Sequence, residues 1–110
     1  MKKTERSVEV WMRDSLAGIL SETEEGYSFV YDEAYLEMEG ARPVSLTLPL
    51  SGKAFESTIL FPFFDGLIPE GWLLDTVSRN WKINRSDRFG LLGVACSDTV
   101  GAVSIRGGRL

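Results

Sequence analysis

The sequence contains few side chains of the kinds that enzymes use for acid–base or nucleophilic chemistry. It has no histidine, the commonest general base and metal ligand, and Cys96 is its single cysteine. A thiolate metal site, a Ser-His-Asp triad and a Cys-His pair are therefore excluded. Asp65 and Glu70 could form an acid pair, but the chain has 16 acidic residues and such a pair carries little information. We expect no intrinsic catalysis, no cofactor and no metal.

The sequence also lacks clear motifs for phosphate or nucleic-acid chemistry. The sequence has neither a Walker loop nor the catalytic-loop pattern of a kinase. The tetrapeptide GLLG at Gly90–Gly93 superficially resembles a clamp for a nucleic-acid backbone. Both of its middle residues are leucines within a helical pattern, which favours helix packing instead.

The most unusual stretch is FPFFDGLIPEGW, residues 61–72, which combines aromatic residues, prolines, glycines and acids. It could be an active-site loop, cover a small core, or form a surface that another protein binds. On a helical wheel Trp72 falls nearly opposite the apolar stripe of the helix that follows. That stripe consists of Leu73, Leu74, Val77 and Trp81.

Two interpretations of Trp72 stay open. The side chain could fold back over Phe63 or Phe64, or it could face outward because a partner covers it, as interface anchors commonly do. On the second interpretation the candidate partner-binding residues are the aromatic and charged side chains of the stretch and of the helix after it. They are Phe63, Phe64, Asp65, Glu70, Trp72, Asp75 and Arg79.

Charge is unevenly distributed along the chain, whose formal net charge is −4. No Lys or Arg occurs between Asp14 and Ala41, where acids accumulate, and a basic cluster follows later. That cluster is Arg79, Lys82, Arg85 and Arg88. Each region could be a solvated face or could be complementary to a partner. The net charge argues against a nucleic-acid binder, which usually carries a basic face.

Length and composition predict one globular domain over residues 1–110. The chain is 44% hydrophobic and 25% charged, as globular proteins are. No apolar run is long enough for a membrane-spanning helix, and the start, MKKTERSVEV, lacks the apolar region of a signal peptide. A lone cysteine forms no internal disulfide and is typical of a reducing cytoplasm. We therefore expect a cytoplasmic protein that does not contact a membrane.

The first half of the chain has the period-two pattern of strands. Residues 7–12 alternate Val8, Val10 and Met12 with polar or aromatic residues. Turns at residues 13–18 and 24–26 lead to strands over residues 18–23 and 27–32, which predicts a β-meander. Residues 43–50 alternate most clearly of all. Because Pro49 cannot donate to a ladder, we expect an edge strand there or a strand that ends at Pro49.

The second half is predicted to be mainly helical. Residues 33–39 suggest one helical turn that ends at Gly40, and Pro69 begins a helix that continues to about Lys82. Residues 84–97 start another helix, with Asn84 or Ser86 as N-cap and Asp87 in its first turn. A last strand covers residues 100–107. The predicted fold is α+β: a small antiparallel sheet or partly closed barrel of about five strands, packed with two to three helices.

The sequence resembles the N-terminal subdomain of the HipA family of serine/threonine kinase toxins. The resemblance rests on FPFFDGLIPEGWLLDTV and INRSDRFGLLGVACSDTVGAVSI, and the early strands and VSLTLPL also fit. The family has an aromatic pair, a Leu-Leu-Pro-Glu-Gly-like turn, a helix, a D-x-F-x-L-L helix and a D-x-x-G-A strand. Ile68 replaces the more usual leucine. The matching residues are Phe63, Phe64, Leu67, Pro69, Glu70, Gly71, Asp87, Phe89, Leu91, Leu92, Asp98, Gly101 and Ala102.

HipA-like kinases continue into a catalytic core, whereas this sequence stops at Leu110. In this respect it resembles the free-standing HipS-like antitoxins of tripartite HipBST systems. The resemblance implies two partners: a HipT-like serine/threonine kinase toxin, which the antitoxin binds and neutralises, and a HipB-like DNA-binding protein in a ternary complex. It carries over no catalytic residue, because none lies in this part of the family.

Two other hypotheses remain. The sequence could be the N-terminal regulatory subdomain of a full-length HipA-like kinase, in which case a kinase reading frame would continue downstream. It could also be a nucleic-acid-binding module that uses the basic cluster, which would bind DNA with a steep salt dependence. The net charge of −4 disfavours the second of these.

Overall fold

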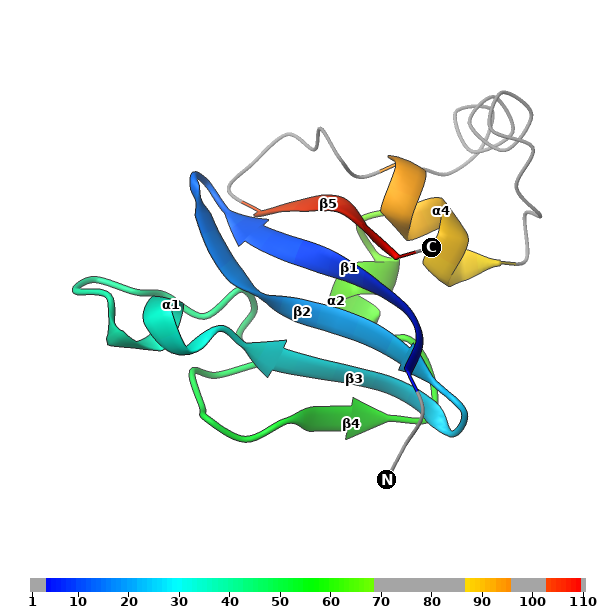
Figure 1. Ribbon diagram of the computed structural model, residues 1–110, viewed down its shortest axis with the longest axis horizontal. Helices are drawn as coiled ribbons and strands as arrows, with labels where there is room; N and C mark the ends of the chain where they lie inside the picture. Colours follow the sequence, from blue (N-terminus) through cyan, green and yellow to red (C-terminus); the bar gives the residue numbers. More distant parts are fainter. Residues whose placement is uncertain (1–3, 69–86, 96–102, 110) are drawn as a thin grey trace.

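The computed structural model describes residues 4–68, 87–95 and 103–109 of the chain. In this part, five antiparallel strands form one open sheet in the order β4-β3-β2-β1-β5 (Figure 1). The strands are β1 (Thr4–Met12), β2 (Ser15–Thr23), β3 (Gly26–Tyr31), β4 (Phe55–Ser57) and β5 (Val103–Arg109). The described helices are α1 (Glu33–Glu37), α2 (Pro62–Asp65) and α4 (Arg88–Ala95). The predicted α+β class is confirmed, and the sheet is open rather than closed into a barrel, with β4 and β5 at its two edges.

The predicted β-meander of the first three strands is confirmed. Val8 of β1 pairs with Leu20 of β2, and Leu20 pairs in turn with Phe29 of β3. Directly paired residues share one face of a sheet, so these three side chains form a row on the same face. All three are fully or almost fully buried. The alternation of apolar and polar residues in these strands therefore reflects a sheet with one covered face.

The turn between β1 and β2 is shorter than predicted. It consists of Arg13 and Asp14 alone, and Arg13 has a φ of 54°, in the left-handed region. Further along β2, Gly18 lies in close contact with β3. A Cβ atom at this position would lie 2.4 Å from the Val30 carbonyl oxygen and 2.8 Å from the Phe29 ring. Only glycine permits the two strands to approach this closely.

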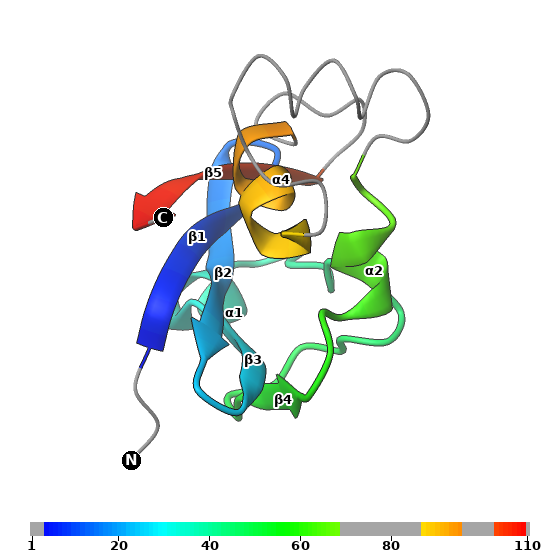
Figure 2. The same cartoon turned by 90° about the vertical axis from the view of Figure 1, so that its right-hand side faces the viewer.

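The helices α2 and α4 cover one face of the sheet, as Figure 2 shows with the sheet seen edge-on. The core lies between these helices and the strands. Phe64 of α2 and Phe89, Leu91 and Leu92 of α4 are fully buried there. The prediction that Gly90–Gly93 packs within a helix is confirmed, since this segment is part of α4. The loop between α1 and β4 contributes Val44 and Leu48 to the same core.

The prediction of a strand over residues 43–50 is wrong. The segment is a tight turn in which Ser45 and Leu48 form an isolated bridge. Val44 and Leu48 are buried, whereas Leu46 is exposed over 97% of its surface. The apolar side chains thus do not share one face, as they would in a strand. The short strand β4, which the sequence did not indicate, pairs with β3 instead and forms this edge of the sheet.

The helix boundaries also differ in detail from the prediction. Asp32 caps α1, its carboxylate accepting a bond of 3.3 Å from the Tyr35 amide, and Met38 is already extended. Helix α4 begins at Arg88, and its N-cap is Asp87 rather than Asn84 or Ser86. The Asp87 carboxylate accepts from the Gly90 amide at 3.1 Å, and its carbonyl accepts from the Leu91 amide at 3.0 Å. The helix predicted over residues 69–82 lies outside the described residues.

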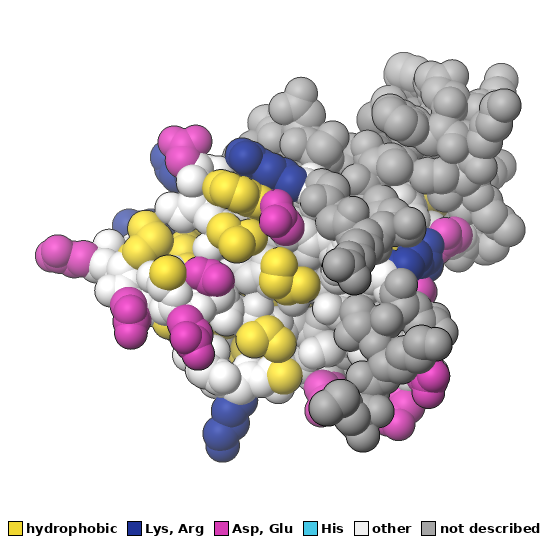
Figure 3. All heavy atoms as spheres, in the orientation of Figure 1, with side chains coloured by type: hydrophobic (Ala, Val, Ile, Leu, Met, Phe, Trp, Pro, Cys, Tyr) yellow, Lys and Arg dark blue, Asp and Glu magenta, His cyan; other side chains and the backbone are white. Residues whose placement is uncertain are grey.

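The opposite face of the sheet carries no described helix and faces the viewer in Figure 3, where hydrophobic side chains gather among acidic and basic ones. Trp11 of β1 lies on this face. Its indole nitrogen donates to Glu9 at 3.1 Å, and the guanidinium of Arg106 on β5 stacks over its ring at 4.1 Å from the centroid. Within the described residues, no helix is long and apolar enough to cross a membrane.

Candidate partner-binding surface

Helix α2 positions the aromatic pair that the sequence singled out. Pro62 occupies its first turn, where the missing N–H costs no hydrogen bond. Phe64 points into the core, with its ring centroid 5.5 Å from that of Phe29 and 5.2 Å from that of Phe63. Because Phe64 is fully buried, it has no surface to offer a partner. The assignment of Phe64 to the partner-binding residues is therefore corrected: its role is to anchor α2 to the sheet.

Phe63 and Asp65 occupy different positions from Phe64. Both are half-buried and so retain surface that a partner could contact. Asp65 accepts a bond of 2.7 Å from Nε of Arg88, the first residue of α4, in a pair that is partly exposed on both sides. The pair joins α2 to α4. It also means that Arg88 is already paired with an acid on its own chain, which weakens the case for Arg88 as a phosphate-binding residue.

The remaining predicted partner-binding residues are Glu70, Trp72, Asp75 and Arg79. All four lie outside the described residues, as do Lys82 and Arg85 of the basic cluster. Their contact with a partner stays a prediction. Of the candidate acid pair, Glu70 lies outside the described residues and Asp65 forms an ion pair with Arg88.

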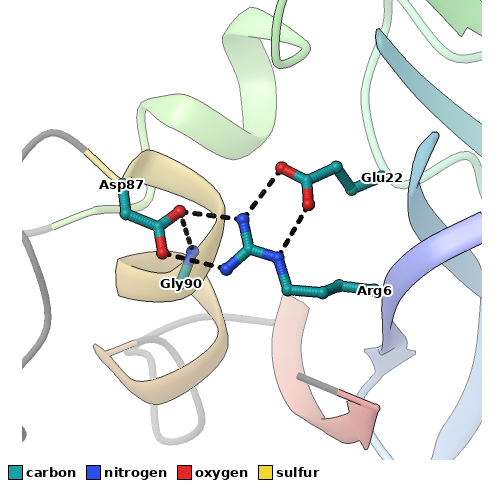
Figure 4. A network of polar contacts seen from close by, with 4 residues as sticks. All are labelled: Arg6, Glu22, Asp87 and Gly90. Atoms are coloured by element: carbon teal, nitrogen blue, oxygen red, sulfur yellow. Dashed lines mark hydrogen bonds and ion pairs between the residues drawn. The ribbon is translucent and has the colours of Figure 1, made fainter. Parts of the chain in front are cut away.

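A network centred on Arg6 fixes α4 against the sheet, as Figure 4 shows. The Arg6 guanidinium donates to both carboxylate oxygens of Glu22 on β2, at 2.7 and 2.8 Å. It also donates to both oxygens of Asp87, at 2.9 Å each. The guanidinium lies 5.1 Å from the centroid of the Phe89 ring. One side chain of β1 thereby holds the N-terminus of α4 and the neighbouring strand together.

This network shifts the pKa values of Arg6 and Asp87. Hydrogen bonds from Arg6 lower the pKa of the Asp87 carboxyl, and the bond from the Gly90 amide adds to this against the opposing effect of burial. The bonds to Glu22 and Asp87 raise the pKa of Arg6 further above its already high value. Arg6 and Asp87 are therefore both charged at neutral pH. The network is an electrostatic clamp and not a proton donor or acceptor.

The sequence interpretation missed the roles of Arg6 and Glu22. A signal was nevertheless present, because Arg6 lies two residues before Val8 and therefore on the face of β1 that is covered. A charged residue at such a position needs a partner of opposite charge. The sequence could have indicated that Arg6 is paired, but not with which acids.

The described residues hold no group of three or more His, Cys, Asp or Glu side chains that could bind a metal ion. The part of the chain that is described contains a hollow of about 580 Å³ between the β1–β2 turn and the loop after α1. Met12, Met38, Arg13 and Arg42 are among the residues that line it. It contains no pair of catalytic carboxylates.

The fold and these packed elements define a small sheet-and-helix module, and the sequence comparison identifies its class. Residues 8–106 match the family described as the HipA N-terminal domain. The chain therefore belongs to the HipA N-terminal domain family. The matched domain is the N-terminal domain of HipA, not its kinase domain.

The chain is also similar to individual proteins and to a solved structure. The chain is 34% identical over 106 residues to an uncharacterized protein of Haemophilus influenzae, and the match covers 96% of each chain. It is 29% identical over 103 residues to the "Putative kinase Y4mE" of Sinorhizobium fredii, of which it spans 24%. Among solved structures it is similar to the "N-terminal domain of HipA toxin", with a TM-score of 0.71 and 29% identity. That likeness covers 99% of this chain and 98% of the other.

Proposed function

We propose that this protein is a HipS-like antitoxin that binds and neutralises a HipT-like serine/threonine kinase toxin. The observation that carries the proposal is its membership of the HipA N-terminal domain family over nearly its whole length. In the relative from Sinorhizobium fredii, named "Putative kinase Y4mE", the match spans only 24% of a longer protein. The relative from Haemophilus influenzae, by contrast, matches over 96% of its length and has about the extent of this domain alone.

The chemistry of the chain supports a binding role. It has no histidine and one cysteine, so it lacks the groups with which a neutral-pH catalyst would most often work. A domain of this size can supply the roughly 800 Å² per partner of a standard interface. Inhibition would then be steric and conformational: the domain docks beside the nucleotide-covering lobe of the kinase and prevents productive closure. A HipB-like DNA-binding protein would complete a ternary complex.

Growth rescue tests the proposal. Cells that express the HipT-like kinase encoded beside this protein should stop growing, and co-expression of this protein should restore growth. The two proteins should also co-purify as a complex. Failure of rescue with an excess of folded protein would refute the antitoxin role. Rescue without a complex would refute direct neutralisation, because the effect would then be indirect.

A second candidate function follows from the kinase relative. The chain could be the N-terminal regulatory subdomain of a longer HipA-like kinase, since it matches 24% of the Sinorhizobium fredii protein. The gene sequence downstream distinguishes the two functions. An uninterrupted kinase reading frame there would favour the regulatory subdomain. A stop codon after Leu110 and a separate kinase gene would favour the antitoxin.

A further inference from the structure

Leu46 is exposed to an extent that is unusual for a leucine in a folded domain. It lies at the tip of the Ser45–Leu48 turn with 97% of its surface accessible. The other exposed large hydrophobic residues of the described part retain between 38% and 65%. Single exposed leucines are common, so exposure alone does not indicate a site. Leu46 differs from an ordinary exposed leucine because the turn that carries it is held firmly in place.

The turn that carries Leu46 is fixed from both sides. Val44 and Leu48, its neighbours at two residues on either side, are buried in the core. The Tyr31 hydroxyl donates to the Leu48 carbonyl and accepts from the Val44 amide at 3.0 Å. Inside the turn, the Leu48 amide donates to the Ser45 carbonyl at 3.0 Å. Leu46 is therefore presented on a rigid support, and little conformational entropy would be lost if a partner covered it.

The segment that carries Leu46 is poor in charged residues. Residues 43–60 include only two charged residues, Lys53 and Glu56. Leu50 and Ile59, which also expose apolar surface, belong to the same segment. Interface cores are depleted in charged residues, whereas an ordinary solvated loop is not. The low charge of this segment and the exposure of Leu46 are thus both features of a protein–protein interface.

We infer that Leu46 is an anchor residue that inserts into an apolar pocket of the kinase; this inference rests on the proposed function. The segment between α1 and β4 reaches the side of the sheet that carries α2 (Figure 2), and its Val44 and Leu48 share the core with Phe64. A kinase docked on the exposed residues of α2 would approach the molecule from this side. The pocket it offers is apolar and leucine-sized, with a polar rim that meets the Ser45 and Thr47 hydroxyls.

Titration calorimetry with the adjacent HipT-like kinase tests this inference. The variants are Leu46→Ser, the conservative Leu46→Met, and Val30→Ser as the matched control. Val30 is also exposed and apolar, but it lies on the opposite face of the sheet. Because Leu46 is almost fully exposed, Leu46→Ser should change the melting temperature by no more than about 3 °C. Loss of a buried leucine should weaken kinase binding about tenfold or more.

We expect Leu46→Ser to raise Kd at least about tenfold, with Leu46→Met and Val30→Ser within about twofold of the wild type. Wild-type binding together with an unchanged Kd for Leu46→Ser would overturn the inference and leave the antitoxin role intact. An equal loss in Leu46→Ser and Val30→Ser would also overturn it. No binding by the wild type would refute the proposed function itself. Analytical ultracentrifugation tests whether a second copy of this chain contacts Leu46 instead. If the wild type is a homodimer that Leu46→Ser dissociates, and the variant still binds the kinase, Leu46 serves self-association and the inference is wrong.

Discussion

Arg6 and Asp87, which are separated by 81 positions in the sequence, are joined by two hydrogen bonds of 2.9 Å each. Arg6 belongs to β1 and Asp87 is the N-cap of α4, so the pair fastens the helix to the sheet. The same guanidinium binds both oxygens of Glu22. Only a planar fork of several donors can serve two carboxylates in this way, and lysine cannot.

Replacement of Arg6 should therefore destabilise the fold even when positive charge is retained. We expect Arg6→Lys to lower the free energy of unfolding by about 1 kcal/mol, since the pairs are partly exposed and partly screened by solvent. Arg6→Met should cost more, because it leaves two carboxylates near one another without a cation. Urea unfolding at neutral pH measures both, with Arg13→Lys in the exposed β1–β2 turn as the control. An Arg6→Met variant as stable as the wild type would show that the network contributes nothing.

Stability should also depend on pH through Asp87. Its pKa is lowered in the folded protein, so its contribution is complete above the ordinary value of 3.8 and is lost as pH falls through the folded value. Asp87→Asn keeps a good N-cap but removes the charge. The stability difference between wild type and variant should be about 1 kcal/mol at neutral pH, and it should shrink in acid below about pH 4. Urea titrations at several pH values give this difference, and a constant value down to pH 2 would contradict the assigned role.

The sequence predicted some parts of this structure for clear physical reasons. Val8 and Val10 alternate with outward residues because one face of the sheet is covered, and such a pattern is local. Residues 43–50 show the same alternation for another reason: Val44 and Leu48 are buried, while the turn between them holds Leu46 in solvent. A pattern alone does not distinguish these cases. The pairing of Arg6 with Asp87 could not be predicted, because it depends on the packing of α4 against the sheet.

Gly18 should be among the least replaceable residues of the sheet. Gly18→Ala would place a methyl group 2.4 Å from the Val30 carbonyl oxygen, which belongs to the backbone and cannot move aside cheaply. We expect a loss of about 1–3 kcal/mol, as for other overpacked sites. Gly52→Ala is the matched control, because no atom lies within 4 Å of its added Cβ. Thermal unfolding of the two variants compares them, and equal melting temperatures would contradict the close approach of β2 and β3.

The two tryptophans after Pro69 provide a test of the predicted partner-binding helix. They lie outside the described residues, so the prediction rests on the helical wheel. Trp72→Ala should weaken kinase binding at least about thirtyfold with little change in melting temperature. Trp81→Ala, on the apolar stripe, should instead cost about 3–5 kcal/mol of stability. If Trp72→Ala melts early while its folded fraction binds normally, Trp72 belongs to the core.

Tyr31 should act on kinase binding indirectly, because its hydroxyl holds both ends of the turn that presents Leu46. Tyr31→Phe leaves the buried Val44 amide and Leu48 carbonyl without this partner, which should cost about 1–3 kcal/mol of stability. The turn should then loosen and kinase affinity should fall, although Leu46 itself is unchanged.

Tyr35→Phe is the matched control for Tyr31→Phe. The Tyr35 hydroxyl likewise bonds to the backbone, at the carbonyl and amide of Arg42, but Arg42 is exposed and water can replace it. We therefore expect a smaller loss of stability and unchanged kinase binding. Combining Tyr31→Phe with Leu46→Ser separates the two effects on affinity. If Tyr31 acts by positioning Leu46, the double variant should bind no more weakly than Leu46→Ser alone, whereas additive losses would show that Tyr31 acts by another route.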